Sequence, residues 1–230
     1  MLPYAHGHLL IGAGFLVMAA LWCLLSRRLG QPAPARLWGL GATLQGMATM
    51  ACAPIAASRA GESVVWDTVY VGAALGGLVA SLLAVREFNK GSDLTRPLAV
   101  AWLAAVLMFL ALRSALPASD EALMAVLIVL AILSVAIARE FGHIARTVRS
   151  PVARGLVALS VFQAVLAIGL IGEVQHGRAT VFGDATAEMP VSSLLVILVF
   201  RAAMHALFAA VLFSSVTHRT EPVPRRLLAP

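Results

Sequence analysis

Residues Val191–Thr217 read VSSLLVILVFRAAMHALFAAVLFSSVT and contain a single charged side chain, that of Arg201. Because the hydrocarbon core of a bilayer is about 30 Å thick, roughly 20 apolar residues of α-helix are enough to cross it. The rest of the chain is similar, since 60% of its 230 residues are apolar and only 12% are charged. A soluble domain has about 25% charged residues, and a disordered chain has low hydrophobicity. The sequence therefore predicts a membrane protein, and it argues against a soluble enzyme.

Six more stretches have the same character, so we expect a single all-α domain over residues 1–230, a seven-helix membrane bundle. Positive charges follow the first stretch instead of preceding it, which is typical of a retained helix and not of a signal peptide. Residues 218–230, with three prolines, form a short tail that is too small for a folded domain. The expected spans are 8–26, 37–57, 64–85, 97–116, 122–138, 152–172 and 191–217, the fifth being the shortest.

The loop charges predict the orientation of these helices. Thirteen of the 17 Lys and Arg residues fall in the tail and in the loops after spans one, three and five, against three in the other loops. Since positive residues favour the cytoplasmic side, the N-terminus is expected outside and the C-terminus in the cytoplasm. The basic loops face anionic lipid headgroups, so the net charge of +6 points to the lipid bilayer as partner and not to nucleic acid. The excess of arginine over lysine is typical of a bacterial sequence, which suggests the inner (plasma) membrane.

Arg201 is the most informative residue of the chain. It lies ten residues into its span, about 15 Å from the outer edge and close to the bilayer midplane. A charge at this depth is expected to face the bundle interior and to have a partner. His205 lies one turn further on the same helical face, in a stripe with Leu194, Ile197, Phe208 and Leu212.

The expected partners of Arg201 are acids near the outer ends of other spans. Asp67 and Glu173 lie at the outer ends of spans three and six, and Asp184 or Glu188 could enter from the outer loop. Two interpretations remain open: an anion-binding or signal-sensing pocket, or an ion pair that only fixes helix register. The candidate ligand-binding residues are Arg201, His205, Asp67, Tyr70 and Glu173.

Other chemical sites have less support. His6 and His8, with His176 in another outer loop, could form a three-histidine metal site, but interfacial histidines are common, so no metal is expected. Cys23 and Cys52 lie in apolar runs and are expected to pack. Gln45 and Gln163 are expected to form hydrogen bonds between helices. No nucleotide, zinc-protease or serine-hydrolase motif is present, so neither a cofactor nor enzymatic activity is expected.

A weak internal repeat links spans three and five. Span three ends with Arg86-Glu87-Phe88 and span five with Arg139-Glu140-Phe141, an offset of 53 residues. Duplication of a helical hairpin explains this, and so does the general preference for an arginine beside an aromatic residue at the membrane surface. Span three also contains Gly72-x-x-x-Gly76, which favours close helix packing.

The chain resembles the N-terminal multi-helix membrane region of bacterial GGDEF-type diguanylate cyclases over about residues 9–218. The similar features are the arginine pair in LWCLLSRRLG (21–30), the tryptophan–glycine patch in RLWGLGATLQG (36–46), and LAVREF (83–88). The resemblance implies a membrane input module that senses a cue for a cytoplasmic domain. No GG-D/E-EF motif is present, so the chain is expected to be either a stand-alone input module or a truncated product.

These features predict a non-enzymatic sensory or signalling module that lacks its own output domain and acts through a separate cytoplasmic partner or a homo-oligomer. In this interpretation a cue biases two packings of the bundle and the last span moves. His205 could make the response depend on pH. The alternative is a small transporter or permease for an anionic solute, with Arg201 as the counter-charge. A subunit of a larger membrane complex is a weaker third possibility.

Overall fold

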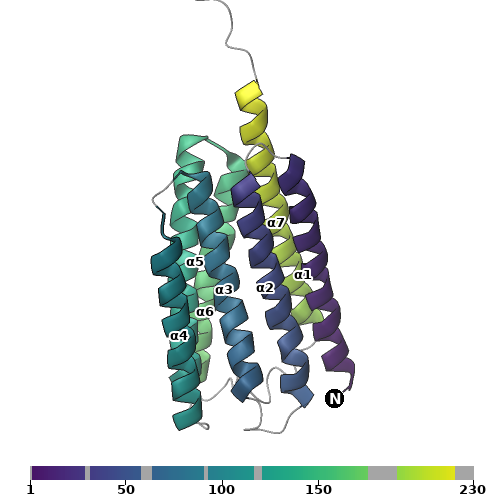
Figure 1. The fold of residues 1–230 in the computed structure, drawn as a ribbon, viewed down its shortest axis with the longest axis vertical. Coiled ribbons are helices and arrows are strands. Elements are labelled where there is room, and N and C mark those ends of the chain that lie inside the picture. The colour runs from purple at the N-terminus through teal and green to yellow at the C-terminus, as the bar shows by residue number, and fades with distance from the viewer. Residues whose placement is uncertain are drawn as a thin grey trace, which may run out of the picture.

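The computed structural model describes residues 2–28, 32–57, 64–90, 93–116, 121–175 and 191–220, which form seven α-helices and no strand. The helices run side by side as one bundle (Figure 1). They are α1 (Leu2–Arg28), α2 (Pro32–Ala57), α3 (Val64–Phe88), α4 (Thr95–Ala115), α5 (Glu121–Thr147), α6 (Pro151–Gln175) and α7 (Val191–Thr220). The prediction of an all-α chain is confirmed. α5 continues nine residues beyond the expected end of its span, because the Arg, Glu and Ala residues that follow favour helix.

Five of these helices are long and apolar enough to cross a membrane, as expected for a membrane protein. They are α1 from His6 onward, α3, α4, α5 and α6, whereas α7 contributes a shorter apolar stretch, Val199–Ser214. α2 is not among the five. It packs between α1 and α3, so part of its surface is covered by other helices and is free to carry small and polar residues.

Glycines bring α2 and α3 into close contact. A Cβ atom added to Gly77 would lie 2.8 Å from Cγ of Gln45 and 3.0 Å from the carbonyl oxygen of Gly41. This approach places Gln45 and Ser81 on facing surfaces inside the bundle. Gly72 and Gly76 face α4, where the Trp102 indole donates a hydrogen bond of 2.8 Å to the Gly72 carbonyl. The packing role expected for this glycine pair is confirmed.

Two ion pairs join α3 to its other neighbours. Arg86 on α3 binds Glu140 on α5 at 2.8 Å, and the Asn89 side chain donates a further 2.9 Å bond to the same carboxylate. Arg113 on α4 binds the fully buried Asp67 on α3 at 3.1 Å, at the opposite end of the bundle. α3 is therefore fixed at one end to α5 and at the other to α4.

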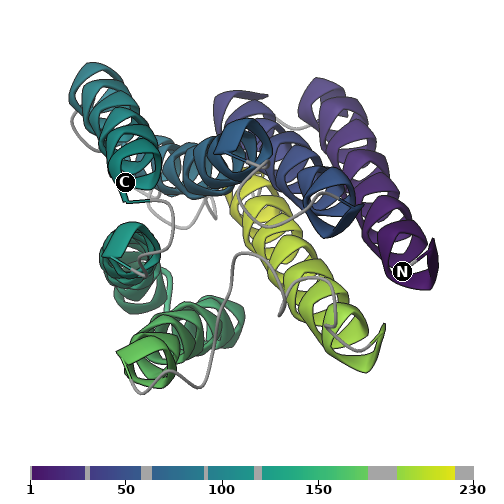
Figure 2. The same cartoon turned by 90° about the horizontal axis from the view of Figure 1, so that it is seen from below.

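α7 packs against α1 on one side and α6 on the other. Seen along the bundle, α7 crosses between α1, α2 and α3 on one side and α5 and α6 on the other (Figure 2). Large side chains fill the space beside it. The Phe208 ring stacks on Trp38 with centroids 4.2 Å apart, and Trp22, Phe88 and Phe141 surround it at 5.8 to 6.5 Å. We call Trp22, Trp38, Phe88, Phe141 and Phe208 the aromatic cluster.

We predict that a side chain at position 77 weakens the contact between α2 and α3. Gly77→Leu should destabilise the bundle by about 1–3 kcal/mol through overpacking, which lowers the melting temperature by about 2–4 °C per kcal/mol. Gly169→Leu is the matched control, because Gly169 on α6 has no atom within 4 Å of an added Cβ. Thermal unfolding of both variants in detergent, followed by circular dichroism, measures the difference. Equal melting temperatures would contradict the packing described.

Candidate functional site

A small polar cavity lies at the centre of the bundle, halfway along five helices. The space amounts to about 10 Å³, enough for one water-sized molecule. Leu78, Ile137 and Met204 contribute apolar wall, and Trp38 closes one side. The polar lining residues are Gln45 on α2, Ser81 on α3, Ser134 on α5, Ser160 and Gln163 on α6, and Arg201 and His205 on α7.

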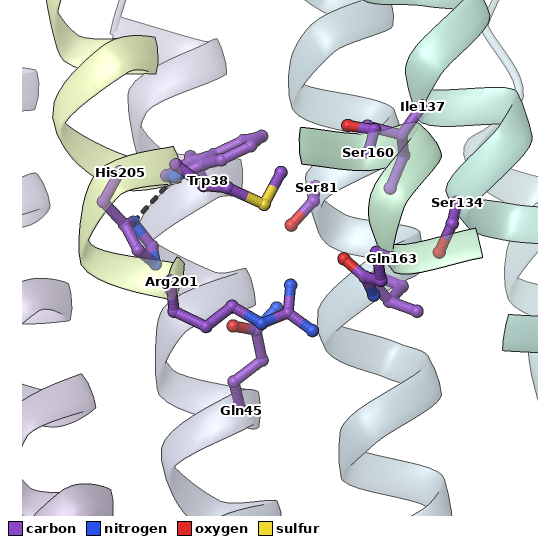
Figure 3. Close-up of a pocket in the computed structure, with 11 residues that line it drawn as sticks. Trp38, Gln45, Ser81, Ser134, Ile137, Ser160, Gln163, Arg201 and His205 are labelled. Atoms are coloured by element: carbon purple, nitrogen blue, oxygen red, sulfur yellow. Dashed lines mark hydrogen bonds between the residues drawn. The ribbon is translucent and has the colours of Figure 1, made fainter. Parts of the chain in front are cut away.

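Among the described residues that line this cavity, Arg201 alone carries a formal charge. Its side chain extends from α7 and places the guanidinium between Gln45 and Gln163 (Figure 3). Within the described residues the guanidinium forms neither an ion pair nor a hydrogen bond, and its one ring contact is with the neighbouring Phe200, 5.9 Å from the centroid. Because an arginine stays protonated in proteins, a full positive charge faces the cavity.

Three further polar side chains of the cavity have unused hydrogen-bonding atoms. Gln45 Oε1, Ser160 Oγ and Gln163 Nε2 are buried and have no hydrogen-bond partner within the described part of the chain. Gln45, Gln163 and Ser160 are 9%, 8% and 1% exposed, so their side chains cannot turn out of the bundle without repacking. A buried polar group left unpaired costs about 1–3 kcal/mol. Three of them in one cavity beside a cation favour an occupant that bonds to them.

Two serines line the cavity from equivalent positions of the internal repeat. Ser81 donates to the Gly77 carbonyl at 2.9 Å, and Ser134 donates to the Leu130 carbonyl at 2.8 Å. The two positions are 53 residues apart, the same offset that relates Arg86 to Arg139. Each hydroxyl donates one turn back along its own helix, which leaves its oxygen lone pairs available as acceptors.

His205 is held by two tryptophans. The indole N–H groups of Trp22 and Trp38 both donate to its Nδ1, at 2.9 Å and 2.7 Å. An imidazole nitrogen that accepts hydrogen bonds carries no proton, so the ring is neutral and its proton sits on Nε2. Nε2–H is therefore the donor that His205 has left for the cavity. Charging the ring would place a proton on Nδ1 against both indoles, so the arrangement does not favour His205 as a pH sensor.

The structure brings together only part of the site expected from the sequence. Arg201 and His205 line the same cavity, and Tyr70 is close enough to interact electrostatically with Arg201. Glu173 lies exposed near the end of α6, and no described contact joins it to Arg201. Asp184, Glu188 and the side chains of Leu194 and Ile197 lie outside the described residues.

The expected pairing of Asp67 with Arg201 is corrected by the structure. Asp67 binds Arg113 instead, with an Nε to Oδ2 distance of 3.1 Å. In the sequence, Arg113 lies at the outer end of the expected span 97–116 and is counted with the outer charges, but in the structure its side chain is only 8% exposed. Because Arg113 turns into the bundle at the same end as Asp67, it neutralises that carboxylate, and Arg201 needs another counter-charge.

The described residues contain no group of three or more His, Cys, Asp or Glu side chains that could hold a metal ion. His6 is exposed, His8 is buried, and the third member of the suggested histidine site, His176, lies outside the described residues. The chain was compared with protein-family models, with curated proteins and with solved structures, and none of them matches it. The resemblance to cyclase membrane regions therefore remains a prediction.

We predict that His205 is the Nε2–H tautomer. Nitrogen-15 NMR of the labelled protein in detergent at pH 7 should show Nδ1 as an unprotonated acceptor, with the signal assigned by its loss in His205→Gln. Trp38→Phe should shift this signal, because one of the two donors is removed, whereas Trp102→Phe should leave it in place. A proton on Nδ1, or a doubly protonated ring, would contradict the geometry.

Proposed function

We propose that this chain is a non-enzymatic sensory or signalling module of a bacterial inner membrane. The observation that carries the proposal is the position of Arg201 on α7, which faces a polar cavity inside the bundle and has no ion-pair partner among the described residues. A charge at membrane depth is strongly unfavourable unless something neutralises or solvates it. The position of α7 is therefore expected to depend on what occupies the cavity, and this dependence is the basis of a sensor.

In this proposal all seven helices cross the bilayer, with the N-terminus outside and the C-terminus in the cytoplasm. The concentration of positive residues in alternate loops supports this orientation. α2 has 26 residues and α7 has 30, about 39 and 45 Å of helix, both longer than a bilayer core of about 30 Å. α2 crosses as a helix largely surrounded by protein, which explains its lower hydropathy.

α7 is suited to carry the signal. Besides packing against α6 and α1, it contacts the bundle through the aromatic cluster and the His205 bonds, and such side-chain contacts allow two alternative packings more readily than tight backbone contacts do. The last turns of α7 extend beyond the ends of the other helices (Figure 1). A shift of α7 would therefore be read at its C-terminal end by a separate cytoplasmic partner or by a second copy of the chain. The resemblance to cyclase input regions supports the same direction of signalling.

A small permease for an anionic solute is the second candidate function. The mid-bundle position of the cavity favours it, because transporters bind substrate near the membrane midplane between repeated units. The serines contributed by the two repeat-related helices, α3 and α5, fit the same description.

We predict that α7 takes two positions in the membrane. Spin labels at Arg219→Cys on α7 and Thr147→Cys on α5, in a Cys23→Ser, Cys52→Ala background, should give two distance populations in liposomes. Arg201→Gln should change their ratio at least several-fold, because it removes the charge that couples α7 to the cavity. Arg28→Gln, at the exposed end of α1, is the control and should leave the ratio unchanged. A single population in every variant would contradict the sensor proposal.

The same variants separate the two candidate functions. A permease should move small anions across proteoliposomes at a rate that Arg201→Gln abolishes. The sensor proposal expects no flux above empty liposomes, with the two α7 positions retained. Flux that depends on Arg201 would establish the permease instead.

A further inference from the structure

We infer that the central cavity binds one small monovalent inorganic anion, of the halide class, against the guanidinium of Arg201. This inference rests on the proposed function, because it names the ligand of the same cavity. It follows from three features of the site: an uncompensated charge, converging donors, and a volume too small for other anions.

The described carboxylates leave the charge of Arg201 uncompensated. Asp67 and Glu140 are paired with Arg113 and Arg86. The remaining described acids are exposed, and no described contact joins any of them to Arg201. They are Glu87, Asp93, Glu121 and Glu173. A diffusible anion supplies the missing charge without repacking the bundle.

Hydrogen-bond donors converge on the cavity from three helices. Arg201 contributes its guanidinium, and His205 contributes Nε2–H because both indoles occupy Nδ1. Gln163 Nε2 and Ser160 Oγ are buried donors with no partner in the described residues. Gln45 presents Oε1, and half a turn about the last side-chain bond replaces this oxygen with the amide nitrogen as a further donor. Donors beside a cation suit an anion, whereas Ser81 and Ser134, which already donate along their own helices, supply no donor to it.

The size of the cavity selects the class of anion. About 10 Å³ holds one water-sized molecule, so phosphate, sulfate and organic carboxylates do not fit. Leu78, Ile137 and Met204 complete the wall with apolar surface, which favours an ion that gives up its hydration shell at low cost. Chloride meets both conditions, whereas the smaller fluoride loses its hydration shell only at high cost.

Halide titration of the purified protein tests the inference. The protein is placed in gluconate buffer and titrated with sodium bromide, while tryptophan fluorescence and melting temperature are recorded. Trp38 lines the cavity, so a heavy halide bound there should quench it with a saturable curve, and chloride should compete. The melting temperature should rise with the same midpoint, by mass action. Phosphate and sulfate should have no such effect.

Variants connect the signal to the cavity. Arg201→Gln should abolish the saturable component, and Gln163→Ala, which keeps the charge, should weaken halide binding about tenfold. Arg86→Gln, whose residue pairs with Glu140 outside the cavity, is the matched control and should bind as the wild type does. The pair Asp184→Asn and Glu188→Gln should also leave binding unchanged.

The outcomes separate this inference from the proposed function. Linear quenching in the wild type, or equal binding in Arg201→Gln, would mean that water occupies the cavity, and the inference would be overturned. If the two α7 positions persist in that case, the sensor proposal stands with another cue. Saturable binding that leaves the α7 positions unchanged would establish the anion site but contradict the sensor. Stronger binding after the Asp184 and Glu188 substitutions would show that a loop carboxylate is the native counter-charge.

Discussion

The positive charge of Arg201 is the interaction on which the rest of this account depends. A guanidinium near the middle of a bilayer costs several kcal/mol unless something neutralises or solvates it. The bundle surrounds it with two glutamines, three serines and a histidine, but not with a described carboxylate. The described cavity wall therefore solvates a charge that it does not neutralise, and the proposed sensor depends on this imbalance.

The packing around the cavity divides into fixed and adjustable parts. Glycine contacts hold α2 against α3, and ion pairs hold α3 against α4 and α5. These contacts leave little freedom, because close backbone approach and buried charge pairs lose energy quickly when displaced. α7 packs against α1 and α6 and is further joined to the bundle by stacked rings and by two indole hydrogen bonds to one imidazole. In the proposed sensor, a stiff frame with one adjustable helix would convert a local event at Arg201 into a displacement at the end of α7.

The internal repeat gains a structural meaning from this division. Phe88 and Phe141 are related by the 53-residue offset, and both contact Phe208 on α7. Ser81 and Ser134 share the offset and both line the cavity. Equivalent positions of α3 and α5 thus contact α7 at the aromatic cluster and share with it the lining of the central cavity. Together with the matched Arg86 and Arg139, these correspondences are what a duplicated hairpin would produce.

The sequence was sufficient for the helices and for part of the site. Long apolar stretches set by bilayer thickness gave seven helices, and one helical turn placed Arg201 and His205 on the same face. The partner of Asp67 could not be predicted from the sequence. The pattern of apolar residues does not show whether the side chain of Arg113, at the end of a helix, points into the bundle or away from it. The two indole bonds to His205 join residues 183 and 167 positions apart, and no local pattern records them. Ser134 was accessible to sequence reasoning, through the repeat that already related Arg86 to Arg139.

Locating bromide in crystals of the protein tests the central claim most directly. Crystals grown in sodium bromide and measured at the bromine absorption edge reveal the ion by its anomalous scattering. The account expects a single strong peak in the central cavity, within about 3.5 Å of the Arg201 guanidinium and of His205 Nε2. A cavity that contains only water, or a carboxylate of this chain bound to Arg201, would contradict the claim that an external anion balances this charge.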